Sequence, residues 1–271
     1  MLKKLLLYPL VLLALIIIGS NLWGLATQGK LEPDTAATID TAANRVVVVF
    51  GATGSVGDGL LKAAMADPDV NEVHVFTRRS SPRIDQGTAS GRVTSYMHED
   101  FTDYSAYSEL LARTNTVLWG LGTTSIGMDD ATYTRIHVDF PMAFIRQWLA
   151  TRQDAPMAFH FVTGMGTDPE GGQHWAREKG RTEREMAEAA SATGLRTFSY
   201  RSGFIRPATE NAGPADYVAE WLFRWGNLAI TGLELGQSML EISARDDLPN
   251  GTLVDNADTI AYARAYRARQ P

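Results

Sequence analysis

The sequence predicts an α/β protein built on a doubly wound parallel sheet, and three features support this prediction. Short runs of β-branched and aromatic residues alternate with helical periodicity between residues 46 and 201. The first run is followed by three glycines at three-residue intervals, Gly51, Gly54 and Gly57. Ahead of both lies an uncharged stretch, Leu5 to Gly29, which predicts a single N-terminal hydrophobic helix.

Composition and charge exclude several classes of function. The 271 residues suffice for one substantial core after residue 44. A net charge of −6, without a basic cluster, argues against nucleic acid as a partner. The chain has no cysteine, which excludes disulfides, thiolate catalysis and a lipoprotein anchor. Its histidines are scattered without metal-ligand spacing, so we expect no metal site.

Residues 1–26 are predicted to be a transmembrane anchor or a signal segment. As a helix, Leu5–Ala26 would span roughly 33 Å, about the hydrocarbon thickness of a bilayer, with Trp23 at the interface. We favour a retained single-pass anchor that places the protein in a membrane. The two lysines at the start, the apolar centre and Gly24–Ala26 also match a cleaved signal peptide, which would leave a secreted or lumenal protein.

Residues 27–44 are rich in threonine and alanine, lack apolar periodicity and are expected to form a linker. The lysines before the hydrophobic segment favour a cytoplasmic amino end and a domain on the other side of the membrane. A nucleotide cofactor is scarce in a bacterial periplasm, and two lysines are a small signal. The side of the membrane therefore stays open.

The segment from residue 46 to 57 predicts a Rossmann-type dinucleotide site. Val46–Phe50 is expected to be a buried parallel strand that leads through a tight turn into a helix. The N–H groups of the first helical turn would face a pyrophosphate, and glycine is needed where a side chain would block it or strain the turn. The alternative is a glycine-rich structural turn. The expected cofactor contacts are Gly51, Thr53, Gly54, Ser55, Val56 and Gly57.

The second strand, Glu72–Thr77, ends in Arg78 and Arg79. At this position an acid would bind the ribose 2′-hydroxyl of NAD, whereas arginine accommodates the 2′-phosphate of NADP. No acid stands here, so NADP is predicted and NAD is less favoured. The alternative is that both arginines lie in a solvated loop.

Residues 80–91 are polar and are expected to form a loop before a third strand, 92–97. Asp100 and Phe101 follow that strand. The carboxylate could accept a hydrogen bond from the adenine amino group while the ring lines the base site. A helix-capping role for Asp100 is an equal alternative.

A fourth strand, Thr116–Trp119, precedes Gly120, Leu121 and Gly122, whose small size would let the backbone approach the cofactor. A long helix is expected over residues 129–151, with either a kink or a helix start near Pro141. The later elements are expected at 157–162 (strand), 174–193 (helix), 196–201 (strand) and 255–268 (helix).

Parallel strands place their carboxyl ends at one edge of the sheet, where ligands bind in this class. The residues expected to converge there are Gly51, Arg78, Asp100, Gly122, Thr163 and Arg201. The sequence thus predicts one site assembled from the ends of six strands.

Three motifs together resemble the atypical short-chain dehydrogenase/reductase superfamily: residues 51–57, 175–183 and 200–207. With Leu121–Thr124 they are similar to the branch of Tat-interacting oxidoreductase-like proteins. The resemblance extends over about residues 45–265. It implies NADP binding by a Rossmann domain, here residues 45–271, whose small C-terminal region completes the substrate cleft.

The resemblance also implies catalytic roles. Lys179 would bind the nicotinamide ribose and lower the pKa of the acid, and Thr163 would hold a substrate carbonyl. The usual catalytic tyrosine is replaced by Trp175, whose indole donates a hydrogen bond but does not exchange a proton near neutral pH. His174, Tyr133 or water could supply the proton, or no reduction occurs. Main-chain groups of Ser202, Gly203 and Phe204 would fix the nicotinamide.

Residues 217–230 contain Trp221 and Trp225, which share one face at helical spacing. Core packing, a lid over an apolar substrate, and a dimer or membrane-surface contact all remain open for this face. A homodimer is therefore among the expected partners.

Three functions follow. The first is a membrane-anchored, NADP-dependent oxidoreductase for a small, fairly apolar carbonyl or alcohol. The second is a non-catalytic NADP(H)-binding sensor or assembly protein that has lost the tyrosine. The third is an NAD-dependent epimerase or dehydratase, which also normally requires that tyrosine.

Overall fold

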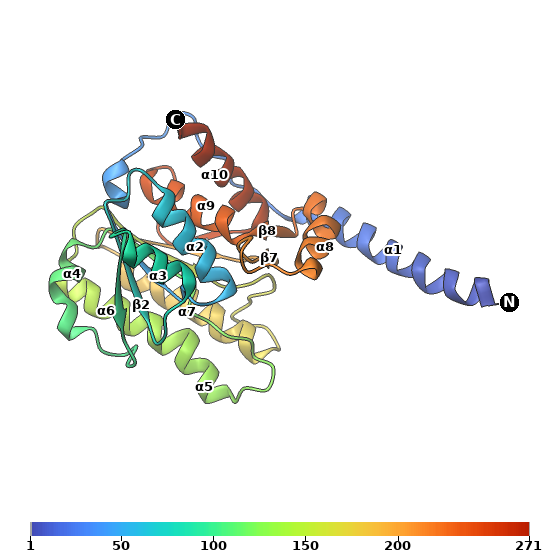
Figure 1. The fold of residues 1–271 in the computed structure, drawn as a ribbon, viewed down its shortest axis with the longest axis horizontal. Coiled ribbons are helices and arrows are strands. Elements are labelled where there is room, and N and C mark those ends of the chain that lie inside the picture. Colours follow the sequence, from blue (N-terminus) through green and yellow to red (C-terminus); the bar gives the residue numbers. More distant parts are fainter. Residues whose placement is uncertain (1, 271) are drawn as a thin grey trace.

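A seven-stranded parallel sheet lies between two layers of helices in the computed structural model, which describes residues 2–270 (Figure 1). The strand order is β3-β2-β1-β4-β5-β6-β9, so the order reverses between β1 and β4. The strands are β1 (Val46–Phe50), β2 (Glu72–Thr77), β3 (Val93–Met97), β4 (Thr116–Trp119), β5 (Met157–Val162), β6 (Leu195–Tyr200) and β9 (Thr252–Val254). The predicted α/β class is confirmed.

A separate two-stranded sheet is formed by β7 (Phe204–Arg206) and β8 (Ala229–Thr231). The helices are α1 (Leu2–Thr27), α2 (Ser55–Ala66), α3 (Pro82–Ala89), α4 (Ser108–Arg113), α5 (Asp130–Thr134), α6 (Phe140–Thr151), α7 (His174–Ala190), α8 (Pro214–Phe223), α9 (Gly232–Ala244) and α10 (Asn256–Arg269). Short helical turns are η1 (Thr41–Asn44), η2 (Ser105–Tyr107), η3 (Arg135–Asp139) and η4 (Arg224–Gly226).

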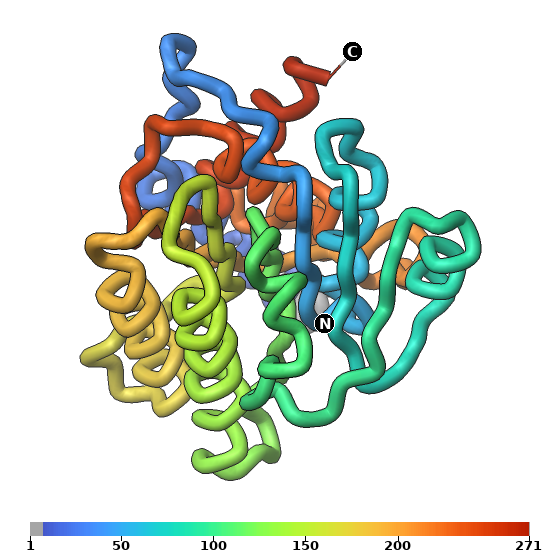
Figure 2. The backbone as a smooth tube through the Cα atoms, turned by 90° about the vertical axis from the view of Figure 1, so that its left-hand side faces the viewer, coloured from blue at the N-terminus to red at the C-terminus, as the bar shows by residue number. Residues whose placement is uncertain are grey.

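The two faces of the sheet are covered by different helices (Figure 1). On one face α2, α9 and α10 bury Leu60, Met239 and Tyr262 against the strands. On the other face α4, α6 and α7 bury side chains that include Phe144 and Trp148. Figure 2 shows α6 and α7 side by side in this second layer. Burial on both faces explains why the central strands are almost wholly apolar.

The segment 80–91, predicted as a loop, contains α3, and this prediction was wrong. Ser81 caps the helix by accepting a hydrogen bond from the Ile84 N–H, and Pro82 occupies its first turn. Ile84 is buried, and Gly87 packs closely against Val93. The helix escaped prediction because it contributes only one large apolar side chain to the core.

A π-helical turn, η3, separates α5 from α6, and Pro141 lies in the first turn of α6, so the predicted break in the helix near this proline is confirmed. Proline has no N–H for the carbonyl of His137, four residues earlier. The Thr182 hydroxyl donates to that carbonyl instead, at 2.8 Å. Thr182, a residue of the 175–183 motif, therefore satisfies the carbonyl that Pro141 leaves without an N–H partner.

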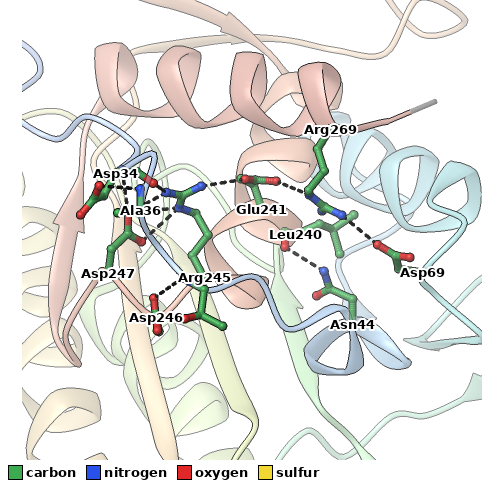
Figure 3. Close-up of polar contacts among 11 residues, drawn as sticks. Asp34, Ala36, Asn44, Asp69, Leu240, Glu241, Arg245, Asp246, Asp247 and Arg269 are labelled. Carbon is green, nitrogen blue, oxygen red and sulfur yellow. Dashed lines mark hydrogen bonds and ion pairs between the residues drawn. The ribbon is translucent and has the colours of Figure 1, made fainter.

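Residues 28–44, which we call the strap, lie along the α9–α10 side of the domain (Figure 3). The N–H groups of Lys30 and Leu31 both donate to the Asp258 carboxylate at 2.9 Å. Arg245 binds the Asp34 carbonyl and is paired with Glu241 at 3.1 Å. The expected linker is thus held against the domain along its length.

The C-terminal turns of α1 are docked on η4. Asn21 is fully buried; its amide donates to the Leu222 carbonyl at 2.9 Å and accepts from the Gly226 N–H at 2.8 Å. A Cβ added to Gly24 would lie 2.1 Å from the Gly226 oxygen, so the two backbones touch. These contacts set where α1 leaves the domain.

Replacing Asn21 by leucine is expected to loosen α1. The change leaves the Gly226 N–H and the Leu222 carbonyl unpaired in a buried place, at a cost of about 1–3 kcal/mol. Tryptic cleavage after Lys30, followed on the full chain in detergent, should become faster. Leu22→Ala, at an exposed neighbouring position, is the control. Equal cleavage rates for both variants would contradict the docking role.

Candidate functional site

Two cavities flank the glycine turn at the carboxyl ends of β1 and β4. The first, of about 510 Å³, contains Arg78 and Arg79 and is called the arginine cavity. The second, of about 310 Å³, contains Lys179 and is called the lysine cavity. Both are lined by Gly54 and by residues 120–122, so the two cavities share a wall. This is the switch point at which ligands bind in open α/β sheets.

The glycine turn is shaped by backbone contacts. Gly51 has φ +74°, and a Cβ there would meet the Gly120 backbone at 2.5 Å. A Cβ on Gly57 would lie 2.0 Å from the Gly51 oxygen, so α2 could not approach β1. A Cβ on Gly54 would come no closer than 3.3 Å to its neighbours. The fold therefore needs Gly51 and Gly57, whereas Gly54 leaves space beside the first turn of α2.

The remaining residues predicted around the turn also border the site. Thr53 lines the arginine cavity, and Ser55 and Val56 line the lysine cavity. The first N–H groups of α2 lie at this point, because the helix begins at Ser55. An anion would be stabilised there by the unpaired N–H groups and the helix dipole.

Arg78 and Arg79 extend from the end of β2 into solvent at the arginine cavity. The Thr77 hydroxyl donates to the Arg79 carbonyl at 2.6 Å and holds the turn. No acidic side chain lines this cavity among residues 2–270. Two guanidinium groups are thus available to an anionic ligand.

The structure separates Asp100 from Phe101. Phe101 is buried and lines the arginine cavity, as expected. The Asp100 carboxylate accepts from the Thr102 N–H at 3.0 Å and lines neither cavity. In this structure Asp100 shapes a turn, in line with the alternative of a local backbone role, and its contact with adenine stays a prediction.

Gly120, Leu121 and Gly122 line both cavities, as expected for a segment that approaches a cofactor. A Cβ on Gly122 would lie 3.0 Å from the ring of His137. A larger residue at this place would therefore displace the histidine.

Lys179 reaches the lysine cavity from α7. Its Nζ donates to the Thr163 carbonyl at 2.9 Å, and burial lowers the pKa of its ammonium group to about 8. Thr163 lines the same cavity, with its hydroxyl donating to the Tyr200 carbonyl at 3.1 Å. The pair predicted from the resemblance is thus assembled at the ends of β5 and α7.

Ser202 is buried at the lysine cavity, and its hydroxyl has no partner among the described residues. Gly203 also lines the cavity and touches the Leu228 carbonyl, where a Cβ would lie at 2.6 Å. The Phe204 N–H donates to the same carbonyl at 2.9 Å. The Phe204 N–H is therefore already bonded beside the β7–β8 sheet, and the next residue, Ile205, borders the lysine cavity instead.

Trp175 does not line the lysine cavity. Its ring covers the loop after β5, where a Cβ on Gly166 would lie 3.5 Å from the indole. The tryptophan at the usual tyrosine position therefore packs on the loop beside Thr163.

His137 also borders the lysine cavity, although it is not among the site residues expected from the sequence. Its Nε2 lies 3.2 Å from the Thr123 carbonyl, while Nδ1 is buried without a partner among the described residues. Burial, with the nearby charge of Lys179, lowers the pKa of His137 to about 3, so the ring is neutral. The sequence offered no signal beyond a polar residue on an apolar helical face.

The other candidate acids lie outside the lysine cavity. Burial raises the pKa of Tyr133 to about 12. His174 stands at the start of α7, 3.8 Å from the Asp130 carboxylate.

Arg201, expected at the sheet edge, is bound to Glu183 at 2.6 Å. Among residues 2–270 no group of His, Asp or Glu has metal-binding geometry.

No protein-family model matches the chain. Two curated fungal proteins are similar in sequence, and both are described by name as mitochondrial. The protein fmp52 of Emericella nidulans is 26% identical over 179 residues, which are 65% of this chain and 73% of the relative. The protein fmp52-1 of Aspergillus terreus is 24% identical over 193 residues, 69% of this chain and 78% of the relative.

Solved structures share the fold. A short-chain dehydrogenase/reductase family oxidoreductase from Burkholderia thailandensis superposes with a TM-score of 0.59 at 18% identity, covering 79% of this chain and 92% of the other. A short chain dehydrogenase from Mycobacterium smegmatis has a TM-score of 0.56 at 17% identity, covering 86% and 98%. A UDP-N-acetylglucosamine 4-epimerase from Methanobrevibacter ruminantium M1 has a TM-score of 0.56 at 15% identity, covering 78% and 76%. The chain has the fold that these enzymes share.

Proposed function

We propose that this chain is a membrane-anchored, NADP-dependent oxidoreductase that acts on a small, fairly apolar carbonyl or alcohol. The observation that supports it most is the shared wall of the two cavities, with arginines on one side and Lys179 on the other. A dinucleotide needs such a pair of compartments, one for each nucleoside, joined at a pyrophosphate site. We also infer membership of the Tat-interacting oxidoreductase-like branch, from Leu121–Thr124 with the other motifs.

The residues present fit NADP. The first turn of α2 would hold the pyrophosphate, and Arg78 with Arg79 would pair with the 2′-phosphate. The unpartnered Ser202 hydroxyl and the Lys179 ammonium would hold the nicotinamide ribose. The nicotinamide, when bound, supplies or accepts the hydride.

Lys179 is the group we propose to handle the proton. Among the side chains that line the lysine cavity, it has the pKa closest to neutrality, at about 8. An acid with a pKa near the working pH transfers protons most effectively. In the reductive direction its ammonium would donate to the substrate oxygen, and water entering the cavity would restore the proton. Thr163 and the neutral His137 would orient the substrate.

A retained anchor is supported by the docking of α1. Residues Tyr8–Thr27 form a 20-residue span with a mean hydropathy of 2.1 and little burial. The buried amide of Asn21 and the contact between Gly24 and Gly226 would both be lost by cleavage near Ala26. A signal peptide has no need of such contacts with the domain, so we propose an anchor that remains in place.

The rival function is a non-catalytic NADP(H)-binding protein, which the tryptophan at position 175 favours. NADPH oxidation by the full chain in detergent, followed against a panel of aldehydes and ketones, tests the two. Turnover of any compound supports the oxidoreductase. Tight NADPH binding without turnover over the whole panel, in the wild type and in Trp175→Tyr, supports the rival.

Trp175→Phe is expected to keep most of the turnover, because the indole packs on the loop and stays outside the lysine cavity. Trp175→Tyr should likewise keep most of the turnover. Initial rates of NADPH oxidation for the two variants provide the measurement. A loss of roughly a hundredfold in Trp175→Phe alone, the size expected for removing a general acid, would contradict the assignment.

Arg78→Ala together with Arg79→Ala is expected to weaken NADPH binding roughly ten- to hundredfold, as for the loss of charged hydrogen bonds, and to leave NADH binding unchanged. Titration of both nucleotides by fluorescence measures the effect. Arg113→Ala, at the amino end of the sheet, is the control. Equal affinity of the wild type for NADPH and NADH would refute the 2′-phosphate assignment.

A further inference from the structure

We propose that α8 and the last turns of α1 form one face that rests on the lipid bilayer, so that the domain lies against the membrane instead of hanging from its anchor. The inference rests on the membrane anchoring proposed above. We define the α1–α8 face by Ile17, Ile18, Tyr217, Val218, Trp221 and Trp225.

This face is apolar and exposed. None of the ten residues of α8 is buried. Trp221 is 76% exposed, Val218 56% and Trp225 46%, so core packing, one of the expected uses of the two tryptophans, does not apply. A groove of about 720 Å³ lies between them and the α1 residues Ile17 and Ile18. A soluble surface would leave these side chains without a partner.

The docking of α1 fixes the depth of α8. The 26 residues of α1 would extend about 39 Å, more than the hydrocarbon core of a bilayer, so the last turns of the helix would lie at the membrane surface. These turns, at Asn21 and Gly24, are the ones that touch η4. Because η4 directly follows α8, α8 lies beside the end of α1 that joins the domain, as Figure 1 shows. In the proposed arrangement this is where α1 leaves the membrane. Tryptophan and tyrosine are enriched at that level of a bilayer.

The charges beside the face favour lipid as its occupant. Arg206 and Glu220 are paired with one another, and Arg224 is paired with Glu234. Among the described residues, the charged side chains that line the groove, Glu220 and Arg224, are thus both in ion pairs, whereas a bilayer requires only apolar and aromatic side chains. A bilayer is also already in contact with the adjoining turns of α1 in the proposed arrangement.

With the α1–α8 face on the bilayer, the lysine cavity would lie close to the membrane. Leu228 packs beside Gly24 of α1, and its carbonyl accepts from the Phe204 N–H. Gly203 and Ile205, on either side of Phe204, line the lysine cavity. Leu228 thus lies between α1 and the wall of the lysine cavity. A cavity this close to the bilayer fits the apolar substrate proposed above.

The absence of cysteine allows a direct test with a single label. Trp221→Cys in the full chain is labelled with an environment-sensitive fluorophore and reconstituted in phosphatidylcholine vesicles. The emission should shift to the blue and be quenched by brominated acyl chains. Met97→Cys, 65% exposed at the edge strand β3, is the control and should stay aqueous. Val218→Cys repeats the test should Trp221→Cys fail to fold.

Vesicle flotation at alkaline pH separates the possible outcomes. A chain that floats while the label at position 221 stays aqueous overturns the face and leaves the anchor intact. A chain released from the vesicles overturns the anchor, and the face with it. A blue shift that grows with the protein-to-lipid ratio and resists brominated lipid assigns the face to a second copy, against the proposal.

Discussion

Lys179→Met should lower turnover by roughly 10²–10⁴-fold, the range for loss of a general acid. Among the described residues, Lys179 is the only cationic side chain that lines the lysine cavity, and the substitution removes both its charge and its hydrogen bond to the Thr163 carbonyl. NADPH affinity should fall less, because the pyrophosphate and 2′-phosphate contacts remain. Initial rates and fluorescence titration on the full chain measure the two effects separately.

The pH profile distinguishes a chemical role of Lys179 from a structural one. Wild-type turnover should fall as pH rises above about 8, where the ammonium loses its proton, and the methionine variant should lack this limb. The unfolded chain keeps that proton up to an ordinary lysine pKa. The free energy of unfolding of the wild type should therefore rise between these two values and that of the variant should not. A declining limb that survives in Lys179→Met would assign the proton to another group. Lys30→Met, at an exposed position, is the control.

Gly57→Ala is expected to destabilise the domain by about 3 kcal/mol or more, since overpacking against backbone allows little relief. The added methyl group would lie 2.0 Å from the Gly51 oxygen and 2.4 Å from its carbonyl carbon. Only a shift of α2 away from β1 could relieve the contact, and the shift would open the proposed pyrophosphate site. The urea concentration at the unfolding midpoint should fall, and NADPH binding should be lost in the same variant.

Substitutions at two other glycines distinguish an effect on the stability of the fold from an effect on cofactor binding. The methyl group of Gly54→Ala would lie 3.3 Å from the Gly51 oxygen, a far milder contact than that of Gly57→Ala, so this variant should lower the unfolding midpoint much less while its methyl group excludes the pyrophosphate. Gly172→Ala has no heavy atom within 4 Å and should change neither property. Unchanged NADPH affinity in Gly54→Ala would remove the pyrophosphate assignment, and a fully stable Gly57→Ala would show that α2 can move.

Much of the architecture could be predicted because it depends on local patterns. The four valines before Gly51 can be hidden on both faces only in a central strand, and β1, β2, β4 and β5 have the predicted bounds. The arginine and lysine cavities were foreseeable for a related reason. Residues that follow parallel strands must meet at one edge, which brought Arg78, Gly122 and Thr163 together.

The sequence by itself determined the strands, the glycine turn and the residue types at the edge of the sheet, because each follows from spacing within a short segment. Only the tertiary structure decided which of those residues face the cavities. It turned Trp175 onto a loop, left Asp100 in a turn and brought in His137 from a helix that looked like core. The contact of Asn21 with Gly226 joins segments about 200 residues apart, which no local periodicity encodes. Such contacts depend on how close two backbones come, and that distance exists only once the layers are packed.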